Sequence, residues 1–160
     1  MDSERLSFIE ESGLLFESTG LTRMSGRIFG YLMICDEDSV SFNKIMDMLH
    51  ASKGSISTNL KLLANADLIE PVSLPGDRKT YYRLTRIHVG ESLKSRLIIF
   101  KKFRELFLKG KQLKNRKDEV SEWLIEAFCF YKWFEDRIDE ITIRWEAEKM
   151  EIMNEFKEKL

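Results

Sequence analysis

The sequence predicts a mainly α-helical protein with a small β-hairpin wing: a winged helix-turn-helix module joined to terminal dimerisation helices. Apolar residues recur at spacings of three and four through most of the chain, which is typical of amphipathic helices. Between residues 68 and 84, two short strand-like runs flank a Pro-Gly-Asp turn. With 43% hydrophobic residues, the 160-residue chain is long enough for one compact domain.

Two helices are expected before residue 36. The first spans residues 6–18 and ends near Gly20, because glycine suits the end of a helix. The second spans residues 22–35 and carries Gly26 and Gly30 four positions apart. This spacing leaves a bare strip on one face of the helix, so we expect a neighbouring helix to approach it closely.

The third and fourth helices form the predicted helix-turn-helix. Ser41 is expected to cap a helix that runs to about residue 50, and Ser52 a helix that runs to about residue 66. The fourth helix has an apolar face at Ile56, Leu60 and Leu63. Its other face carries Lys53, Ser55, Thr58, Asn59 and Lys61. Such side chains suit phosphates and base edges in a DNA major groove, so this helix is expected to read DNA.

The wing is predicted from residues 68–74, a turn and residues 79–84. Pro71 lacks a backbone N–H, so the first strand should lie at a sheet edge or be irregular. Tyr81 and Tyr82 should point to opposite faces of the second strand. Because an isolated hairpin is marginal in water, we expect the wing to lean on the helices.

Two long helices are expected after the wing, at residues 89–111 and from residue 118 to the end of the chain. The last one carries a seam with gaps of four and three, formed by Val120, Leu124, Ala127, Tyr131, Phe134, Ile138, Ile141 and Trp145. A helix of roughly 60 Å exceeds what a core of this size can cover. We therefore expect a homodimer in which the terminal helices of two copies wrap each other. An intramolecular helical hairpin is the rival arrangement.

The expected division follows from these elements. Residues 20–88 would form the winged helix-turn-helix lobe, and residues 1–19 and 89–160 the helical dimerisation region of a single compact chain. Two reading helices would then lie one DNA turn apart, roughly 34 Å, and would bind a pseudo-palindromic site.

The net charge of −1 conceals a strong asymmetry along the chain. Residues 1–50 carry −5, residues 51–86 carry +3, residues 87–114 carry +6, and residues 115–160 carry −5. A basic middle between acidic ends is expected if one part of the molecule meets a polyanion. Solvated helix faces are the alternative, and they explain residues 87–114 better than the turn at residues 77–79.

Other classes of protein are disfavoured by the residues that the chain lacks. It has no apolar run of about twenty residues, and its acidic N-terminus is unlike a secretory signal. Cys35 and Cys129 are expected to be buried free thiols. His50 and His88 lie far apart, without clustered metal ligands. We therefore expect a cytoplasmic protein that is not an enzyme, with no metal and no cofactor.

Four motifs carry a resemblance to a known family. They are GLTRMSGRIFGYLMI at residues 20–34, SKGSISTNLKLL at 52–63, LIEPV at 68–72 and GDRKTYYRLT at 76–85. Together they resemble the MarR superfamily of winged-helix regulators, and most of all its GbsR-like branch. The resemblance covers residues 7–85. The superfamily often has a glycine soon after the Leu-Thr pair found here at residues 84–85. In this chain residues 86–89 intervene before Gly90, so the entry to the next helix differs.

The resemblance implies a set of DNA contacts. The helix at residues 52–66 would enter the major groove, with these polar positions available: Ser52, Lys53, Ser55, Ser57, Thr58, Asn59 and Lys61. Asn59 would pair with adenine and Thr58 would contact a thymine methyl. Arg78, next to Lys79, would probe the minor groove, and Asp77 would orient it.

The aromatic residues of the last helix have two interpretations. They can form core and dimer interface, or they can form an effector pocket, since aromatic cages hold quaternary ammonium groups. The GbsR-like branch includes sensors of choline-type ligands, which implies a small-molecule effector at Tyr131, Phe134, Trp133 and Trp123. Glu126, Glu135 and Asp136 would supply the counter-charge.

These expectations combine into one hypothesis of function: a homodimeric transcriptional regulator, most often a repressor in this family, that binds double-stranded DNA. The alternative is a protein–protein adaptor that uses a winged-helix fold without sequence-specific DNA binding.

Overall fold

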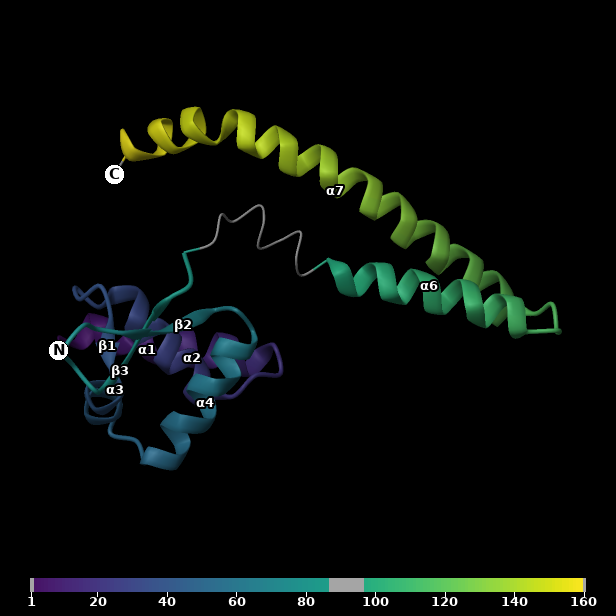
Figure 1. Ribbon diagram of the computed structural model, residues 1–160. Coiled ribbons are helices and arrows are strands. Elements are labelled where there is room, and N and C mark those ends of the chain that lie inside the picture. Colours follow the sequence, from purple (N-terminus) through teal and green to yellow (C-terminus); the bar gives the residue numbers. More distant parts are fainter. Residues whose placement is uncertain (1, 87–96, 160) are drawn as a thin grey trace. The chain divides into compact units, whose positions relative to one another are not determined.

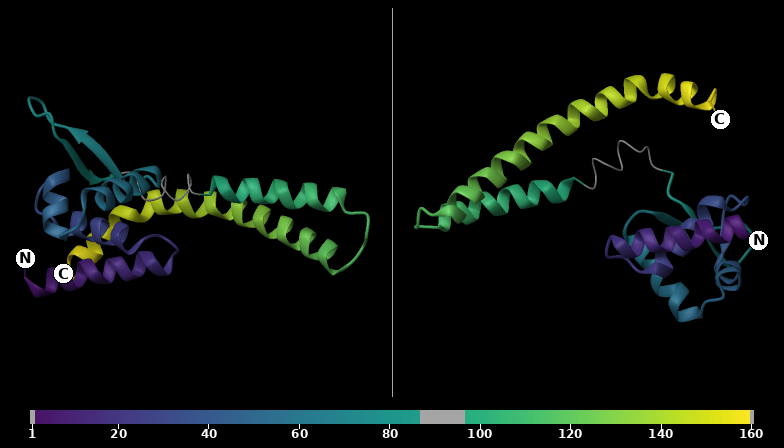
Figure 2. Two further views of the ribbon diagram at one scale, coloured as in Figure 1. Left: turned by 90° about the horizontal axis from the view of Figure 1, so that it is seen from below. Right: turned by 180° about the vertical axis from the view of Figure 1, so that it is seen from behind.

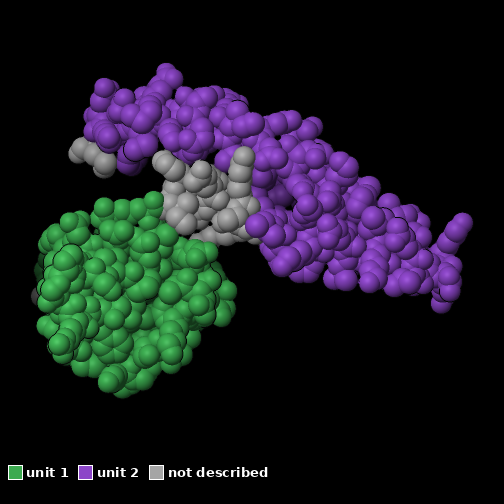
Figure 3. Space-filling model, in the orientation of Figure 1, with its two compact units in different colours: residues 1–86 green, residues 87–160 purple. Residues whose placement is uncertain are grey.

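The structure is a computed structural model that describes residues 2–86 and 97–159 (Figure 1). The chain forms two compact units, residues 1–86 and 87–160, which Figure 3 shows in separate colours. About 70% of the described residues are helical, with a small antiparallel sheet of three strands, so the predicted fold class is confirmed. Residues 89–96 of the predicted fifth helix lie outside the described residues.

Unit 1 contains four helices and three strands. They are α1 (Ser3–Ser18), α2 (Arg23–Ile34), β1 (Val40–Ser41), α3 (Phe42–Leu49), α4 (Lys53–Asn65), β2 (Ile69–Ser73) and β3 (Thr80–Leu84). The helix boundaries follow the caps, because each helix begins after a side chain that accepts a backbone N–H of the first turn. These caps are Asp2, Thr22, Ser41 and Ser52.

The sheet has the order β1-β3-β2. β2 is therefore an edge strand, which confirms the prediction made from Pro71. β1 lies on the other side of β3, with Val40 opposite Tyr82, and the sequence did not predict it. Figure 2 shows the β2–β3 hairpin projecting from the helices of unit 1.

The core of unit 1 lies between its helices and the inner face of the sheet. Its buried apolar residues are Ile9, Ile28, Tyr31, Leu32, Val40, Ile45, Leu49, Ile56, Leu60, Leu63 and Ile69. Tyr82 packs against this core from β3, and burial raises its pKa. Every element of unit 1 except β3 thus contributes at least one buried residue.

α1 and α2 pack at very short range, as the spacing of the two glycines predicted. A Cβ on Gly26 would overlap the Ser12 carbonyl oxygen, and a Cβ on Gly30 would lie 2.6 Å from Ser12 Oγ. Glu10 of α1 adds ion pairs to two arginines of α2, Arg23 at 3.1 Å and Arg27 at 2.8 Å. α1 therefore belongs to the compact unit of the winged helix, although the domain division expected from the sequence groups residues 1–19 with the dimerisation region.

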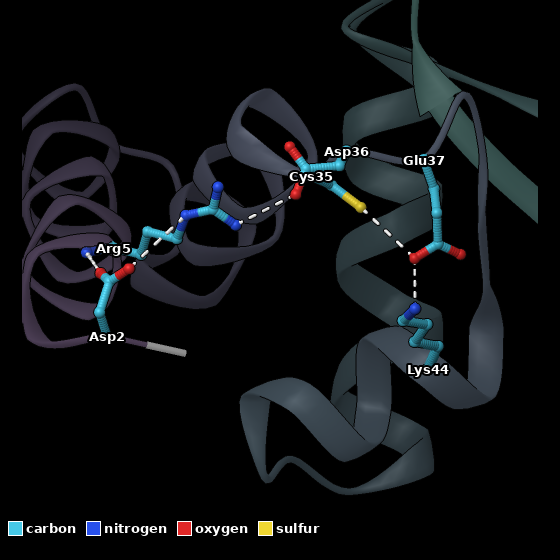
Figure 4. Close-up of polar contacts among 6 residues, drawn as sticks. All are labelled: Asp2, Arg5, Cys35, Asp36, Glu37 and Lys44. Carbon is cyan, nitrogen blue, oxygen red and sulfur yellow. Dashed lines mark hydrogen bonds and ion pairs between the residues drawn. The ribbon is translucent and has the colours of Figure 1, made fainter.

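The acidic loop after α2, residues 36–38, forms ion pairs with three other parts of unit 1. Asp36 pairs with Arg5 of α1 at 3.4 Å, Glu37 pairs with Lys44 of α3, and Asp38 pairs with Arg86 at 3.2 Å. Figure 4 shows the first two of these pairs and the Cys35 thiol, which donates to Glu37 at 3.8 Å. The hydrogen bond to Glu37 raises the pKa of Lys44.

Unit 2 is a helical hairpin of α6 (Ile98–Leu113) and α7 (Glu119–Lys157). Its two helices run antiparallel and side by side (Figures 1 and 2). Phe100 of α6 packs edge-on against Tyr131 and Phe134 of α7, at centroid distances of 5.4 and 5.5 Å. The intramolecular hairpin, considered from the sequence as the rival of the dimer, is thus present along the first part of the α7 seam.

Two further observations concern single features of the chain. Cys129 is exposed and Cys35 is partly buried, so the prediction of buried thiols is wrong for Cys129. The face of α7 that packs against α6 carries Tyr131 and Phe134, and Cys129 is not on this face. Among the described residues, no helix combines the length and the apolar character needed to cross a membrane.

The close α1–α2 packing leads to a stability prediction. Gly26→Ala should lower the free energy of unfolding by about 1–3 kcal/mol, because the added methyl group would overlap backbone atoms of α1. Urea unfolding of the purified protein measures this change. Gly54→Ala is the matched control, because a Cβ at Gly54 meets nothing within 4 Å. It should raise stability by about 0.5–1 kcal/mol. An equal effect of both substitutions would contradict the packing.

Candidate nucleic-acid interface

The burial of one face of α4 decides which of its side chains reach solvent. Ile56 and Leu63 are 0% exposed and Leu60 is 2% exposed. On the opposite side, Gly54, Thr58, Lys61 and Asn65 form an exposed row with spacings of four, three and four. Ser52 and Lys53 are exposed at the start of the helix, and Ser55 and Ser57 are half-buried at the margins of this row.

The start of α4 combines a capping serine, Ser52, with an exposed glycine, Gly54. The Ser52 hydroxyl accepts the Ser55 N–H at 3.3 Å, so its predicted capping role is observed. Gly54 has no steric reason to be glycine among the described residues, since a Cβ there would point into open space. A glycine in the first turn of a helix costs stability. Its placement therefore suits close approach of a partner to the backbone.

The wing tip is held in shape by Asp77. Its carboxylate accepts the backbone N–H of Lys79 at 2.9 Å and the hydroxyl of Tyr81 at 2.8 Å. These two hydrogen bonds, the first of them the larger effect, lower the pKa of Asp77. Asp77 was predicted to orient the Arg78 side chain, but the structure shows it bonded to Lys79 and Tyr81 instead. Asp77 therefore shapes the turn that carries Arg78, and the Arg78 side chain extends into solvent.

The basic residues of unit 1 fall into two groups. Six of the ten Lys and Arg residues between positions 2 and 86 form ion pairs within 4 Å, namely Arg5, Arg23, Arg27, Lys44, Arg83 and Arg86. The other four make no ion pair with any described residue, and all four are exposed: Lys53, Lys61, Arg78 and Lys79. These four residues are the Lys and Arg residues predicted from the sequence to contact DNA.

Comparisons with known proteins agree with this architecture. No family model matches the chain. The HTH-type transcriptional regulator MmpR5 of Mycobacterium tuberculosis (strain ATCC 25618 / H37Rv) is 43% identical over 79 residues, which are 49% of this chain and 48% of that protein. The match thus spans about half the length of the curated relative. A crystal structure of a transcriptional regulator superposes with a TM-score of 0.78 at 30% identity, over 90% of this chain and 99% of its own.

The chain belongs to the winged-helix transcriptional regulators. Within this regulator, α3 and α4 form the helix-turn-helix, and the β2–β3 hairpin forms the wing. The fold therefore brings the predicted positions of α4 and the wing turn into one unit.

Asn59 is the exception among the predicted contact residues of the regulator. Its side chain lies on the inner face of α4 and only 6% of the residue is exposed. The carboxamide donates to the Ser55 carbonyl oxygen at 2.8 Å and accepts from the Thr22 hydroxyl. Both of its ends are thus used inside the protein. The prediction that Asn59 pairs with adenine is corrected, because Asn59 follows Ile56 by three positions and shares the buried face.

The four residues predicted to bind an effector do not form one cage. Tyr131 and Trp123 both pack on Phe107 of α6, each at 5.4 Å between ring centroids. Phe134 packs on Phe100. Trp133 packs on Phe130 at 6.3 Å between ring centroids, and the guanidinium of Arg137 lies over its ring at 5.6 Å. Of the four, only Phe134 lines the small cavity of about 170 Å³ between α6 and α7. Three of the four residues therefore join α7 to α6, namely Trp123, Tyr131 and Phe134.

Proposed function

We propose that this regulator binds double-stranded DNA as a homodimer, with α4 in the major groove and the wing turn on the adjacent backbone or minor groove. The observation that carries the proposal is the separation of the Lys and Arg residues of unit 1 into six that form ion pairs and four that pair with no described residue. Paired cations join elements of the fold. The unpaired ones have no such role, and they gather on α4 and the wing, where phosphates would be their partners.

The exposed row of α4 supplies the groups that base recognition needs. Thr58 offers a methyl group and a hydroxyl, Lys61 offers an ammonium group, and Gly54 lets the helix backbone come near the DNA. α4 contains neither Arg nor Gln, whose planar side chains make strong two-pronged contacts to bases. One copy of α4 would therefore discriminate weakly, which favours two copies on a pseudo-palindromic operator.

The second half of α7 supports the homodimer. α7 has 39 residues and α6 has 16, so α6 can pair with less than half of its partner. Beyond the seam residue Ile138, apolar residues continue on the same side of α7 at Ile141, Trp145, Ile152 and Phe156. Ile141 and Phe156 are 57% and 61% exposed. A second copy of this helix is the partner that would cover such a stripe.

The finer assignment rests on the four motifs that resemble the MarR superfamily. They support placement in the GbsR-like branch and a role as a repressor. A quaternary ammonium effector is not part of the proposal, because the aromatic residues expected to hold it pack on neighbouring phenylalanines and, for Trp133, under Arg137. The adaptor hypothesis is the outcome if DNA affinity proves insensitive to salt.

Removal of two unpaired cations should reduce the salt dependence of DNA binding. The double variant Lys61→Ala/Arg78→Ala should flatten the plot of log K against log salt by about 0.9 for each phosphate that the variant no longer binds. Fluorescence anisotropy with a duplex selected by the wild-type protein from a random pool measures this slope. The control Arg5→Ala/Arg86→Ala removes the same charge from paired cations and should leave the slope unchanged. Equal slopes for the two double variants would refute the proposed interface.

Disruption of the α7 stripe should separate the dimer. Ile152→Glu/Phe156→Glu should shift the protein to a monomer in sedimentation velocity and weaken operator binding, because it places carboxylates in the proposed seam. Ile143→Glu is the matched control. Ile143 is an exposed apolar residue of α7, but its helical position lies on the side away from the stripe. A wild-type monomer, or a dimer insensitive to the double substitution, would contradict the seam.

A further inference from the structure

Asn59 connects α4 to the beginning of α2. Its carboxamide oxygen accepts the Thr22 hydroxyl, and its Nδ2 donates to the Ser55 carbonyl oxygen one turn earlier in α4. Thr22 is the N-cap of α2, and its oxygen accepts the Ser25 N–H at 3.0 Å. A chain of three hydrogen bonds therefore runs from the first turn of α2 into the backbone of α4.

Each bond in this chain has a fixed direction. The Thr22 oxygen takes the Ser25 N–H, which leaves its single proton for the Asn59 oxygen. The Asn59 NH2 group must then face the Ser55 carbonyl, since a carbonyl oxygen can only accept. Reversal of the Asn59 amide would break the bond to Ser55, because it would place two acceptor oxygens against each other. The network thus permits one orientation of Asn59.

The remaining contacts between α4 and the fold are apolar. Ile56, Leu60 and Leu63 pack into the core, and burial of such side chains is not directional. In the described part of the chain, the Thr22–Asn59 bond is the one side-chain hydrogen bond that joins α4 to another element. It is therefore the contact best suited to fix the rotation and the axial position of α4.

We propose that Asn59 and Thr22 are positioning residues that set the register of α4 on α2 and thereby the sequence specificity of the regulator. The inference rests on the proposed DNA-binding function. Base contacts by Thr58 and other short side chains require accurate placement, whereas long lysine side chains reach phosphates from a range of positions. Loss of the bond should therefore weaken operator binding more than non-specific binding.

The test measures the ratio of operator affinity to non-specific affinity at two salt concentrations. Asn59→Leu replaces the carboxamide by an apolar side chain of similar size, which cannot form either hydrogen bond. Thr22→Ala removes the hydroxyl that donates to Asn59. Both should lower the ratio about tenfold, with an unchanged salt slope on non-specific DNA. Thr22→Ser keeps the hydroxyl and should restore the wild-type ratio.

Ser41→Ala separates the positioning role from the loss of a helix cap. The Ser41 hydroxyl caps α3 by accepting the Lys44 N–H at 3.3 Å, and no hydrogen bond among the described residues joins it to α4. This variant should lose stability like Thr22→Ala but keep the specificity ratio. Circular dichroism confirms that each variant is folded, and Thr22→Ala, at an exposed position, serves if Asn59→Leu does not fold.

The possible results have distinct meanings. If operator and non-specific affinities fall by the same factor in Asn59→Leu and Thr22→Ala, the bond is merely structural and the inference is overturned. If Ser41→Ala lowers the ratio as much as Thr22→Ala, the inference is overturned as well. If the wild-type protein binds DNA without salt dependence or discrimination, the proposed function itself fails.

Discussion

The structure depends first on the burial of one face of α4. Ile56, Leu60 and Leu63 fill the core of unit 1, and this fixes which side of the helix can meet a partner. The exposed row that begins at Gly54 follows directly from that packing. α1 and α2 pack closely against each other, and the Thr22–Asn59 hydrogen bond connects this helix pair to α4. The packing of the buried face of α4 thus determines which side chains its exposed face presents.

Electrostatics separates the structural part of unit 1 from its functional part. The acidic loop and Glu10 neutralise basic residues of α1, α2 and α3, so those charges have partners within the fold. α4 carries lysines but no acidic residue, and the wing turn directs its one carboxylate to Tyr81 and a backbone N–H. The basic residues of unit 1 that pair with no described carboxylate therefore lie on α4 and on the wing turn. A phosphate backbone would neutralise their charge.

The sequence predicted the elements better than the side-chain roles. Hydrophobic spacing located the ends of the described helices within a few residues, except the start of α6, which was predicted at residue 89 and is observed at Ile98. Pro71 identified the edge strand, and the glycines of α2 indicated close packing. β1 has only two residues, too few to leave a pattern. Asn59 was misassigned because its polarity suggested exposure, although its position three residues after Ile56 gave the contrary signal. The aromatic residues of α7 were misread because α6, whose phenylalanines contact them, could not be paired with α7 from spacing alone.

Amide chemical-shift perturbation by a selected operator duplex tests the DNA interface most directly. We expect the largest shifts in ¹⁵N-labelled protein on residues 52–61 and 76–80. The side-chain NH2 signals of Asn59 should persist, because that group remains bonded to Ser55. Shifts confined to α1 or to the α6–α7 hairpin, with none on α4 and the wing turn, would contradict this interface.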